Sequence, residues 1–257
     1  MQFTSESITD DVIERTFNVS VKGESVPGVI WTPTDLSKGY PVVLMGHGGG
    51  HHKKIAYLVD LAHKYVRKLG FAVVAIDAPG HGERMPSEQG AQFAAELQKK
   101  LAEGQPVEEL VAKEMARLGM QAVPEWQATL GAVQALDYIG TEEQVGYWGI
   151  SMAGAIGVYL VATEPGISAA VLGLTGLPPN HKALADTAAQ ITIPIEFVLQ
   201  WDDEFVPRDS GLALFDALGS RAKTLHVNPG DHAGIPVWEF ESWDRFFYRH
   251  LETKTAG

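Results

Sequence analysis

The ten residues Val145–Gly154 read VGYWGISMAG and predict a buried strand that runs directly into a helix. The apolar run that ends at Ile150 is typical of a strand covered on both faces, and the small residues after it are typical of a packed helix. Gly149 and Ala153 flank Ser151 at the two positions where a sharp strand-to-helix turn leaves little room for side chains. We therefore expect Ser151 to lie on that turn with its hydroxyl exposed.

The motif departs at one position from the pattern G-x-S-x-G that marks nucleophilic serines on such turns, because Ala153 replaces the final glycine. One extra methyl group leaves the turn feasible, and Gly154 follows at once. A helix that begins at Ser151 or Met152 directs free N–H groups and the positive end of its dipole toward the serine. The alternative interpretation is that Ser151 only caps the helix.

Strands and helices alternate around this motif, as short apolar runs and amphipathic stretches indicate. The predicted strands are Val42–Met45, Phe71–Ile76, Gln144–Gly149, Ala169–Leu174, Ile195–Leu199 and Thr224–Val227, with helices at Ile55–Leu69 and Val237–Leu251. This alternation indicates right-handed crossovers and a mainly parallel α/β sheet. An antiparallel hairpin through residues 17–31 precedes it.

One connection is much longer than a crossover needs, because more than sixty residues separate Asp77 from the strand at Gln144. Trp126–Ile139 predicts the crossover helix, and Glu88–Leu101 and Val107–Leu118 predict two further helices. We expect residues 84–122 to form a helical insertion that covers a pocket as a lid. The alternatives are a structural role and a homodimer interface. We expect residues 1–257 to form one domain, since no linker or repeat divides them.

Composition argues against several function classes. The chain has 257 residues, no cysteine and a formal net charge of −12. Such a charge disfavours nucleic acid and anionic membrane surfaces as partners, and no apolar run is long enough to span a membrane. The absence of cysteine excludes disulfides and thiolate chemistry. The first residues have neither the basic start nor the apolar run of a signal peptide, so we expect a cytoplasmic protein.

A nucleophilic serine needs a histidine base, which in strand–turn–helix enzymes follows the serine and the acid along the chain. We predict His232, because it lies in a Gly/Pro-rich loop after the last predicted strand and can reach over the edge of the sheet. His226 falls within that strand, and we expect it in the core. His181 lies in a loop that could line the site, and His250 belongs to the terminal helix.

The acid that orients the histidine is expected after the strand Ile195–Leu199, where three consecutive carboxylates compete. The spacing D-x-x-V-P places Asp203 where this loop turns toward the histidine. Asp202 is the runner-up, and its alternative role is to hold the loop. Trp201, just before it, indicates a partly apolar acyl or alcohol group in the substrate.

Backbone N–H groups must stabilise the oxyanion that forms during acyl transfer. We predict the N–H groups of Met152 and Gly49, with Gly50 as the next choice, because glycines let the backbone approach a substrate closely. The glycine run 46–50 lacks the Lys-Ser/Thr ending of a phosphate-binding loop and the spacing of a dinucleotide fingerprint. We expect no cofactor and no metal, since the nearby histidines lack the spacing of metal ligands. These are His47, His51, His52 and His81.

Taken together, the motifs resemble those of the α/β-hydrolase superfamily over Val26–Leu251. In family order they are HGGG at 47–50, DAPGHG at 77–82, GISMAG at 149–154, Asp203 before Val206-Pro207, and Gly230-Asp231-His232. The leading hairpin and the D-x-P-G-H-G loop look closest to dienelactone-hydrolase-like and prolyl-oligopeptidase-like esterases. The resemblance implies an α/β-hydrolase fold with an eight-stranded, mostly parallel sheet, and acyl transfer from an ester to water. Serine replaces the cysteine of dienelactone hydrolases proper, so their particular substrate is not implied.

These observations predict a hydrolase that acts on a small-molecule carboxylic ester. Ser151 would attack the carbonyl, His232 would take and return the proton, and Asp203 would hold the imidazole, so that an acyl-enzyme forms and water releases it. Amidases, peptidases, thioesterases and acyltransferases would use the same three residues. The alternative from another class is a non-catalytic protein of this fold that binds a small ligand.

Overall fold

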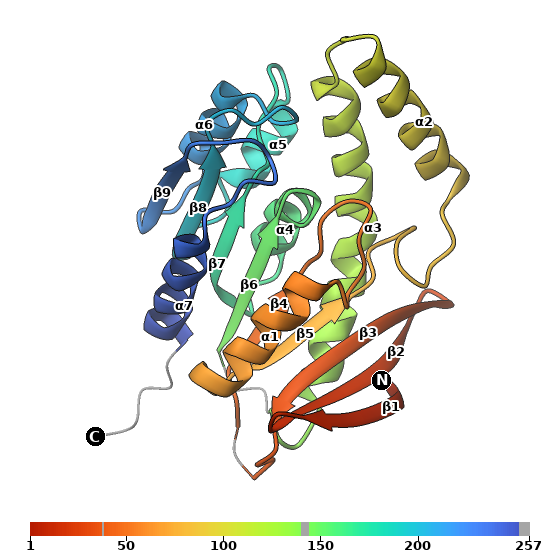
Figure 1. The fold of residues 1–257 in the computed structure, drawn as a ribbon, viewed down its shortest axis with the longest axis vertical. Coiled ribbons are helices and arrows are strands. Elements are labelled where there is room, and N and C mark those ends of the chain that lie inside the picture. The colour runs from red at the N-terminus through yellow and green to blue at the C-terminus, as the bar shows by residue number, and fades with distance from the viewer. Residues whose placement is uncertain (38, 140–143, 252–257) are drawn as a thin grey trace.

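A nine-stranded sheet runs through the part of the chain that the computed structural model describes, residues 1–37, 39–139 and 144–251 (Figure 1). The order across it is β1-β2-β3-β5-β4-β6-β7-β8-β9. The six strands from β5 to β9 in this order are parallel, and β1, β2 and β3 are antiparallel. In chain order the strands are β1 Gln2–Thr9, β2 Val12–Val21, β3 Glu24–Pro33, β4 Val42–Met45, β5 Ala72–Ile76, β6 Val145–Ile150, β7 Ile167–Gly173, β8 Ile195–Gln200 and β9 Lys223–Asn228.

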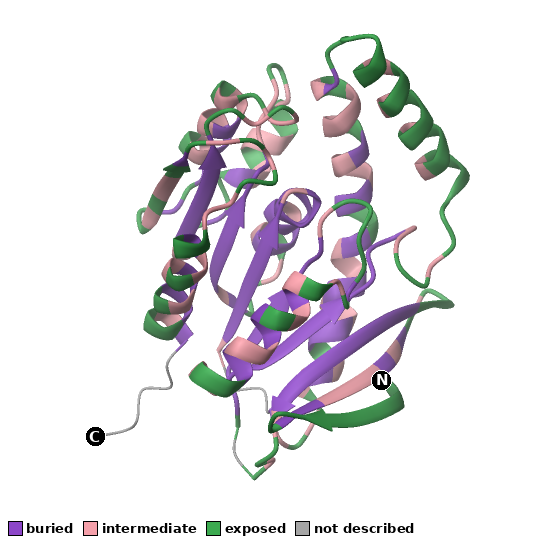
Figure 2. Ribbon diagram, in the orientation of Figure 1, coloured by how far each residue is buried: buried purple, intermediate pink, exposed green. Residues whose placement is uncertain are grey.

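Helices cover both faces of this sheet. They are α1 Ala56–Leu69, α2 Glu88–Ala102, α3 Glu108–Gln134, α4 Met152–Thr163, α5 Lys182–Ala188, α6 Arg208–Ala217 and α7 Val237–Leu251. Tyr65 of α1 and Phe247 of α7 share a core with one face, and Trp126 of α3 and Ile156 of α4 share a core with the other. Figure 2 shows the central strands buried between these layers, which is the arrangement of an α/β-hydrolase fold.

The sheet has one strand more than the eight expected, because β1 adds to its edge. All eight residues of β1 are exposed, and β1 pairs only with β2 among the described strands. Asp10 and Asp11 make the turn between them with positive φ angles of 49° and 63°, the backbone of a tight two-residue hairpin. No buried face imposes an apolar alternation on β1, so its residues show no periodicity that would predict a strand.

The prediction of separate helices at Val107–Leu118 and Trp126–Ile139 is wrong. The chain forms one helix, α3, which continues through Pro124. Proline removes one hydrogen bond and disfavours a helix interior. The helix continues nonetheless because Leu118, Ala122 and Trp126 are buried on one face at helical spacing, so the apolar stripe keeps its phase across the proline.

Residues 84–122 leave the sheet as α2 and the first half of α3. Both segments stand beyond the carboxyl ends of the strands in Figure 1. Arg84, at the start of this segment, makes two hydrogen bonds of 2.7 and 2.9 Å to the carboxylate of Glu125, which lies just beyond its other end. Both side chains are largely buried, so the ion pair ties the base of the insertion together.

The single domain 1–257 and the lid role of its insertion remain predictions, and residues 252–257 lie outside the described part of the chain. Within the described residues, no helix combines the length and the apolarity that crossing a membrane requires.

Candidate active site

Ser151 lies on the turn between β6 and α4, as the motif predicts. Its backbone has φ 63° and ψ −124°, a conformation that costs a residue other than glycine about 1–3 kcal/mol. The turn is so tight that a Cβ atom on Gly149 would lie 2.5 Å from the carbonyl oxygen of Ala153. A Cβ atom on Gly154 would lie 2.4 Å from the carbonyl oxygen of Gly173. Packing against β7 therefore holds the serine in its strained conformation.

The structure explains why alanine is tolerated at position 153. The Ala153 methyl group faces Gly46, where an added Cβ atom would lie only 2.5 Å away. The carbonyl of Ala153 accepts a hydrogen bond of 2.7 Å from the buried Tyr147 hydroxyl. The Ala153 methyl group therefore fits on α4 because Gly46, the residue after β4, has no side chain.

Three side chains from separate loops form a continuous series of hydrogen bonds. Ser151 Oγ lies 2.8 Å from His232 Nε2, and His232 Nδ1 lies 2.7 Å from Asp203 Oδ2. The other oxygen of Asp203 accepts the N–H groups of Phe205 and Val206, each at 2.8 Å. The Asp203 side chain is 1% exposed and therefore fixed, whereas the His232 side chain is 17% exposed and faces the cavity described below.

The two carboxylates beside Asp203 hold the loops. Asp202 accepts the N–H of Gly230 at 3.3 Å, and Glu204 accepts the N–H of His232 at 2.9 Å. The ring of Phe205 meets the His232 imidazole edge to face at a centroid distance of 5.2 Å. In the sequence Glu204 was only one of three competing carboxylates and Phe205 carried no signal, because only the folded loops bring these two residues to the histidine.

Donors for an oxyanion are available on two sides of Ser151. Met152 is the first residue of α4, so its N–H has no acceptor within the helix. Gly49 and Gly50 line the same cavity as Ser151, and an added Cβ atom would meet nothing within 4 Å at either. Gly48 N–H is occupied by the Tyr57 hydroxyl at 3.2 Å. The geometry leaves both Gly49 and Gly50 as candidate second donors.

His47 anchors this glycine loop to the loop after β5. Its Nε2 accepts the Ala78 N–H at 3.0 Å, so its Nδ1 carries the proton that the Gly48 carbonyl accepts at 2.9 Å. Burial lowers the pKa of His47 to about 4, with a further contribution from the neighbouring His81. A neutral imidazole therefore links the two loops at neutral pH.

A buried ion pair also joins the glycine loop to the loop after β5. Lys53 Nζ lies 2.7 Å from Asp77 Oδ2, and both residues are 3% exposed or less. Burial opposes ionisation of Asp77, but hydrogen bonds from the Glu83 N–H and from Lys53 outweigh it and lower the pKa of the carboxyl. Lys53 carried no signal in the sequence, since its partner lies 24 positions later.

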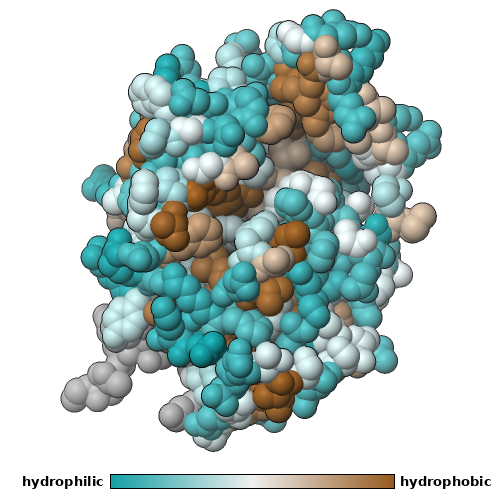
Figure 3. Space-filling view, in the orientation of Figure 1, coloured by the Kyte–Doolittle hydropathy of each residue, from teal (hydrophilic) through white to brown (hydrophobic). Residues whose placement is uncertain are grey.

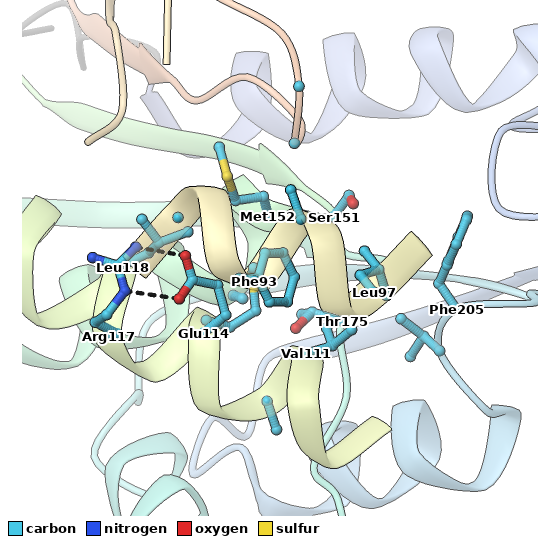
Figure 4. Close-up of a pocket in the computed structure, with 18 of the residues that line it drawn as sticks. Phe93, Leu97, Val111, Glu114, Arg117, Leu118, Ser151, Met152, Thr175 and Phe205 are labelled. Carbon is cyan, nitrogen blue, oxygen red and sulfur yellow. Dashed lines mark hydrogen bonds and ion pairs between the residues drawn. The ribbon is translucent and has the colours of Figure 1, made fainter. Parts of the chain in front are cut away.

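A cavity of about 970 Å³ opens beside Ser151 and His232. Its floor is the Ser151–Met152 turn, and one wall is the insertion, from which Phe93, Leu97 and Val111 contribute (Figure 4). Figure 3 shows hydrophobic side chains around a hollow at this end of the molecule. The cavity therefore offers an apolar wall next to the serine hydroxyl.

Three expectations about neighbouring residues need correction or refinement. His226 is not a core residue, because its side chain is 29% exposed and its Nδ1 lies 2.8 Å from Glu239. Trp201 is 49% exposed and stacks on Arg208 at 3.9 Å, outside the residues that line the cavity. His181 also lies outside that lining, at the start of α5.

Comparison with known proteins places this architecture among esterases. No protein-family model and no curated protein matches the sequence. A cold-adapted esterase from an Arctic intertidal metagenomic library, solved in complex with polyethylene glycol, is 34% identical over 98% of this chain and 100% of its own, with a TM-score of 0.78. The chain belongs to the α/β-hydrolase family of this esterase. A zinc-bound structure of that esterase matches this hydrolase with 30% identity over 98% and 100% of the two chains and a TM-score of 0.75.

More distant structures share the fold of this hydrolase. Acetyl xylan esterase 1 from Thermoanaerobacterium sp. JW/SL YS485 is 15% identical over 98% of this chain and 88% of its own, with a TM-score of 0.70. At that identity the likeness extends to the α/β-hydrolase fold alone. The comparisons as a whole support a hydrolase related to esterases.

Proposed function

We propose that this α/β-hydrolase cleaves carboxylic esters through a Ser151–His232–Asp203 triad. The observation that carries the proposal is the hydrogen-bonded series from Ser151 Oγ through the imidazole to Asp203, with distances of 2.8 and 2.7 Å. A serine hydroxyl is a weak nucleophile unless a base removes its proton, and a buried carboxylate keeps the base in the required tautomer.

The proposed reaction assigns one group of the site to each step. His232 Nε2 takes the proton as Ser151 Oγ attacks the carbonyl carbon, and the Met152 N–H and the Gly49 N–H stabilise the oxyanion. His232 then protonates the leaving alcohol, which leaves an acyl-enzyme on Ser151. Water activated by the same imidazole releases the acid and restores the serine.

The lining of the cavity favours a small-molecule ester with an apolar acyl or alcohol group. Phe93, Leu97 and Val111 bring apolar surface toward the serine, and Leu118 extends it. The Glu114–Arg117 ion pair lies on the same wall, as Figure 4 shows. We propose that residues 84–122 act as the lid of this cavity.

A fluorophosphonate probe tests the nucleophile, because it labels only a serine that a base has activated. We expect one label on Ser151 in the wild-type protein and none in Ser151→Ala, with circular dichroism as the control for folding. Absence of label in the wild type, or equal label in the variant, would contradict the proposal.

Substrate panels separate the remaining alternatives. Matched p-nitrophenyl ester, anilide and thioester substrates with the same acyl group distinguish an esterase from an amidase and a thioesterase. Added alcohol would form a new ester at the expense of hydrolysis if the protein were an acyltransferase. A folded protein that binds the ester without turnover on any of these substrates would be a ligand-binding member of the fold.

A further inference from the structure

A second cluster of polar side chains lies where β8, β9 and α7 meet. Glu196 comes from β8, His226 from β9 and Glu239 from the first turn of α7. One carboxylate oxygen of each glutamate and a ring nitrogen of the histidine all lie within 4.8 Å of one another. None of the three residues is among those that line the cavity beside Ser151.

The hydrogen bonds among these side chains leave the cluster incomplete. Glu196 and Glu239 are 5% and 3% exposed, and both face His226 Nδ1, at 3.8 and 2.8 Å. His226 Nδ1 is within hydrogen-bonding distance of Glu239 alone, because 3.8 Å is too long for a hydrogen bond to Glu196. Glu196 Oε2 accepts the Ser242 hydroxyl at 3.3 Å, but Oε1 is buried with no hydrogen-bond partner in the described structure. A buried polar atom in that state is costly and calls for a partner.

The charges point to a cation as that partner. Two buried acidic side chains face one imidazole, which leaves the cluster with an excess of acidic over basic groups. A divalent ion would neutralise it and would give Glu196 Oε1 a partner.

We propose that Glu196, His226 and Glu239 bind a divalent transition-metal ion, for which zinc is the test case. Imidazole nitrogen and carboxylate oxygen are ligands that zinc accepts, at bond lengths of about 2.0–2.2 Å. Tetrahedral ligands at such lengths lie roughly 3.4 Å apart, between the 2.8 and 3.8 Å that separate His226 Nδ1 from the two carboxylates. His226 is 29% exposed, which leaves room for water in the fourth position.

Bound metal would join the elements that carry the candidate base and acid. His226 and Glu239 flank the loop with His232, because β9 ends at Asn228 and α7 begins at Val237. Glu196 belongs to β8, the strand after which Asp203 follows. The ion would therefore hold the two ends of the His232 loop and the neighbouring strand together, and we expect it to raise the melting temperature.

Metal analysis tests this site directly. The full-length protein is treated with EDTA, dialysed against micromolar zinc chloride and separated from free zinc on a desalting column before elemental analysis. We expect one zinc ion per chain and a higher melting temperature with zinc in the wild type. His226→Gln and Glu239→Gln should each weaken zinc binding by more than about tenfold, since loss of even an outer-sphere partner costs roughly 10–100-fold.

Two control variants separate this site from other histidines. His250→Gln changes a histidine on α7 outside the cluster and should retain the zinc. His232→Ala removes the imidazole beside Ser151 and should also retain it. Wild-type protein without zinc, or His226→Gln and Glu239→Gln variants that bind as much as the wild type, would overturn the proposal. So would loss of the zinc in His232→Ala alone.

A measurement on the wild type alone covers the case in which the cluster variants do not fold. Anomalous diffraction from a zinc-soaked crystal locates the ion. A peak between Glu196, His226 and Glu239 supports the site, and a peak confined to other residues contradicts it.

Discussion

Two of the helices that border the cavity beside Ser151, α2 and α4, are held by the rest of the chain in different ways. Nine of the twelve residues of α4 are buried, between the sheet and α3, whereas no residue of α2 is buried. The side chains of α2 nearest the protein, Phe93 and Leu97, are only half-buried and face the cavity itself. Figure 2 shows this difference between the interior and the insertion.

The difference fits two separate tasks. A nucleophile must be held within a fraction of an ångström of its base, and the strained backbone of Ser151 persists because close-packed neighbours fix it. A wall that admits and covers a substrate works better when its packing is loose and its local opening costs little free energy. Changes around α4 should therefore alter chemistry and global stability, and changes on α2 should alter the choice of substrate.

The largest effect on catalysis is expected at Asp203, which holds the His232 imidazole next to Ser151. Asp203→Asn should lower kcat for ester hydrolysis by about 10⁴-fold, because an amide favours the wrong tautomer of His232. Asp202→Asn changes the neighbouring carboxylate, which only accepts the Gly230 N–H, and should cost less than about tenfold. Steady-state kinetics on a p-nitrophenyl ester measure both. A larger loss in Asp202→Asn than in Asp203→Asn would reassign the acid.

Glycine-to-alanine changes on the two helices should have opposite signs. Gly154→Ala should lower the free energy of unfolding by about 3 kcal/mol, since the new methyl group would overlap the Gly173 carbonyl. Gly90→Ala on α2 meets only the Ser87 hydroxyl, at 3.3 Å, and should stabilise the protein by about 0.5 kcal/mol through helix propensity. Urea unfolding measures both. Equal destabilisation by the two changes would mean that α2 is as tightly packed as α4.

Acid should lower the free energy of unfolding through His47, which is buried in the loop after β4. The native pKa of about 4 lies below the unfolded value of 6.5, so between these pH values the unfolded chain binds more protons. The contribution of His47 to the free energy of unfolding is therefore complete above pH 6.5. It falls by about 2–3 kcal/mol as the pH drops toward 4. Urea unfolding at several pH values should show that the free energy of unfolding depends less steeply on pH in His47→Gln than in the wild type. Parallel pH profiles for the two proteins would exclude His47 as the cause.

The smallest effect is expected on the loosely held wall. Phe93→Ala should lower kcat/KM for a p-nitrophenyl octanoate by about tenfold and leave the acetate nearly unchanged, because only the longer chain reaches this side chain. Leu101→Ala is the matched control, since Leu101 is 44% exposed on the same helix and does not line the cavity. The melting temperature should stay constant in both variants. An equal loss of kcat/KM with the acetate and the octanoate would mean that the acyl chain does not bind against Phe93.

The sequence by itself determined the framework around Ser151. Continuous apolar runs predicted β4 to β8, because strands covered on both faces carry apolar side chains at nearly every position. The same local reasoning predicted the turn at Ser151, since glycines and alanine are the only residues that fit it. His232 and Asp203 were predicted by their position after strands, and the hydrogen bonds between them agree in geometry with that prediction.

Only the tertiary structure decided the features that depend on distant residues. Helix α3 passes through Pro124 because a packed stripe outweighs a local penalty, and β1 forms because an existing edge accepts it. The Lys53–Asp77 ion pair and the Glu196–His226–Glu239 cluster join residues that are far apart in the chain. Periodicity and spacing describe a chain's own neighbours, whereas burial and charge at such sites are set by which segments the fold brings together.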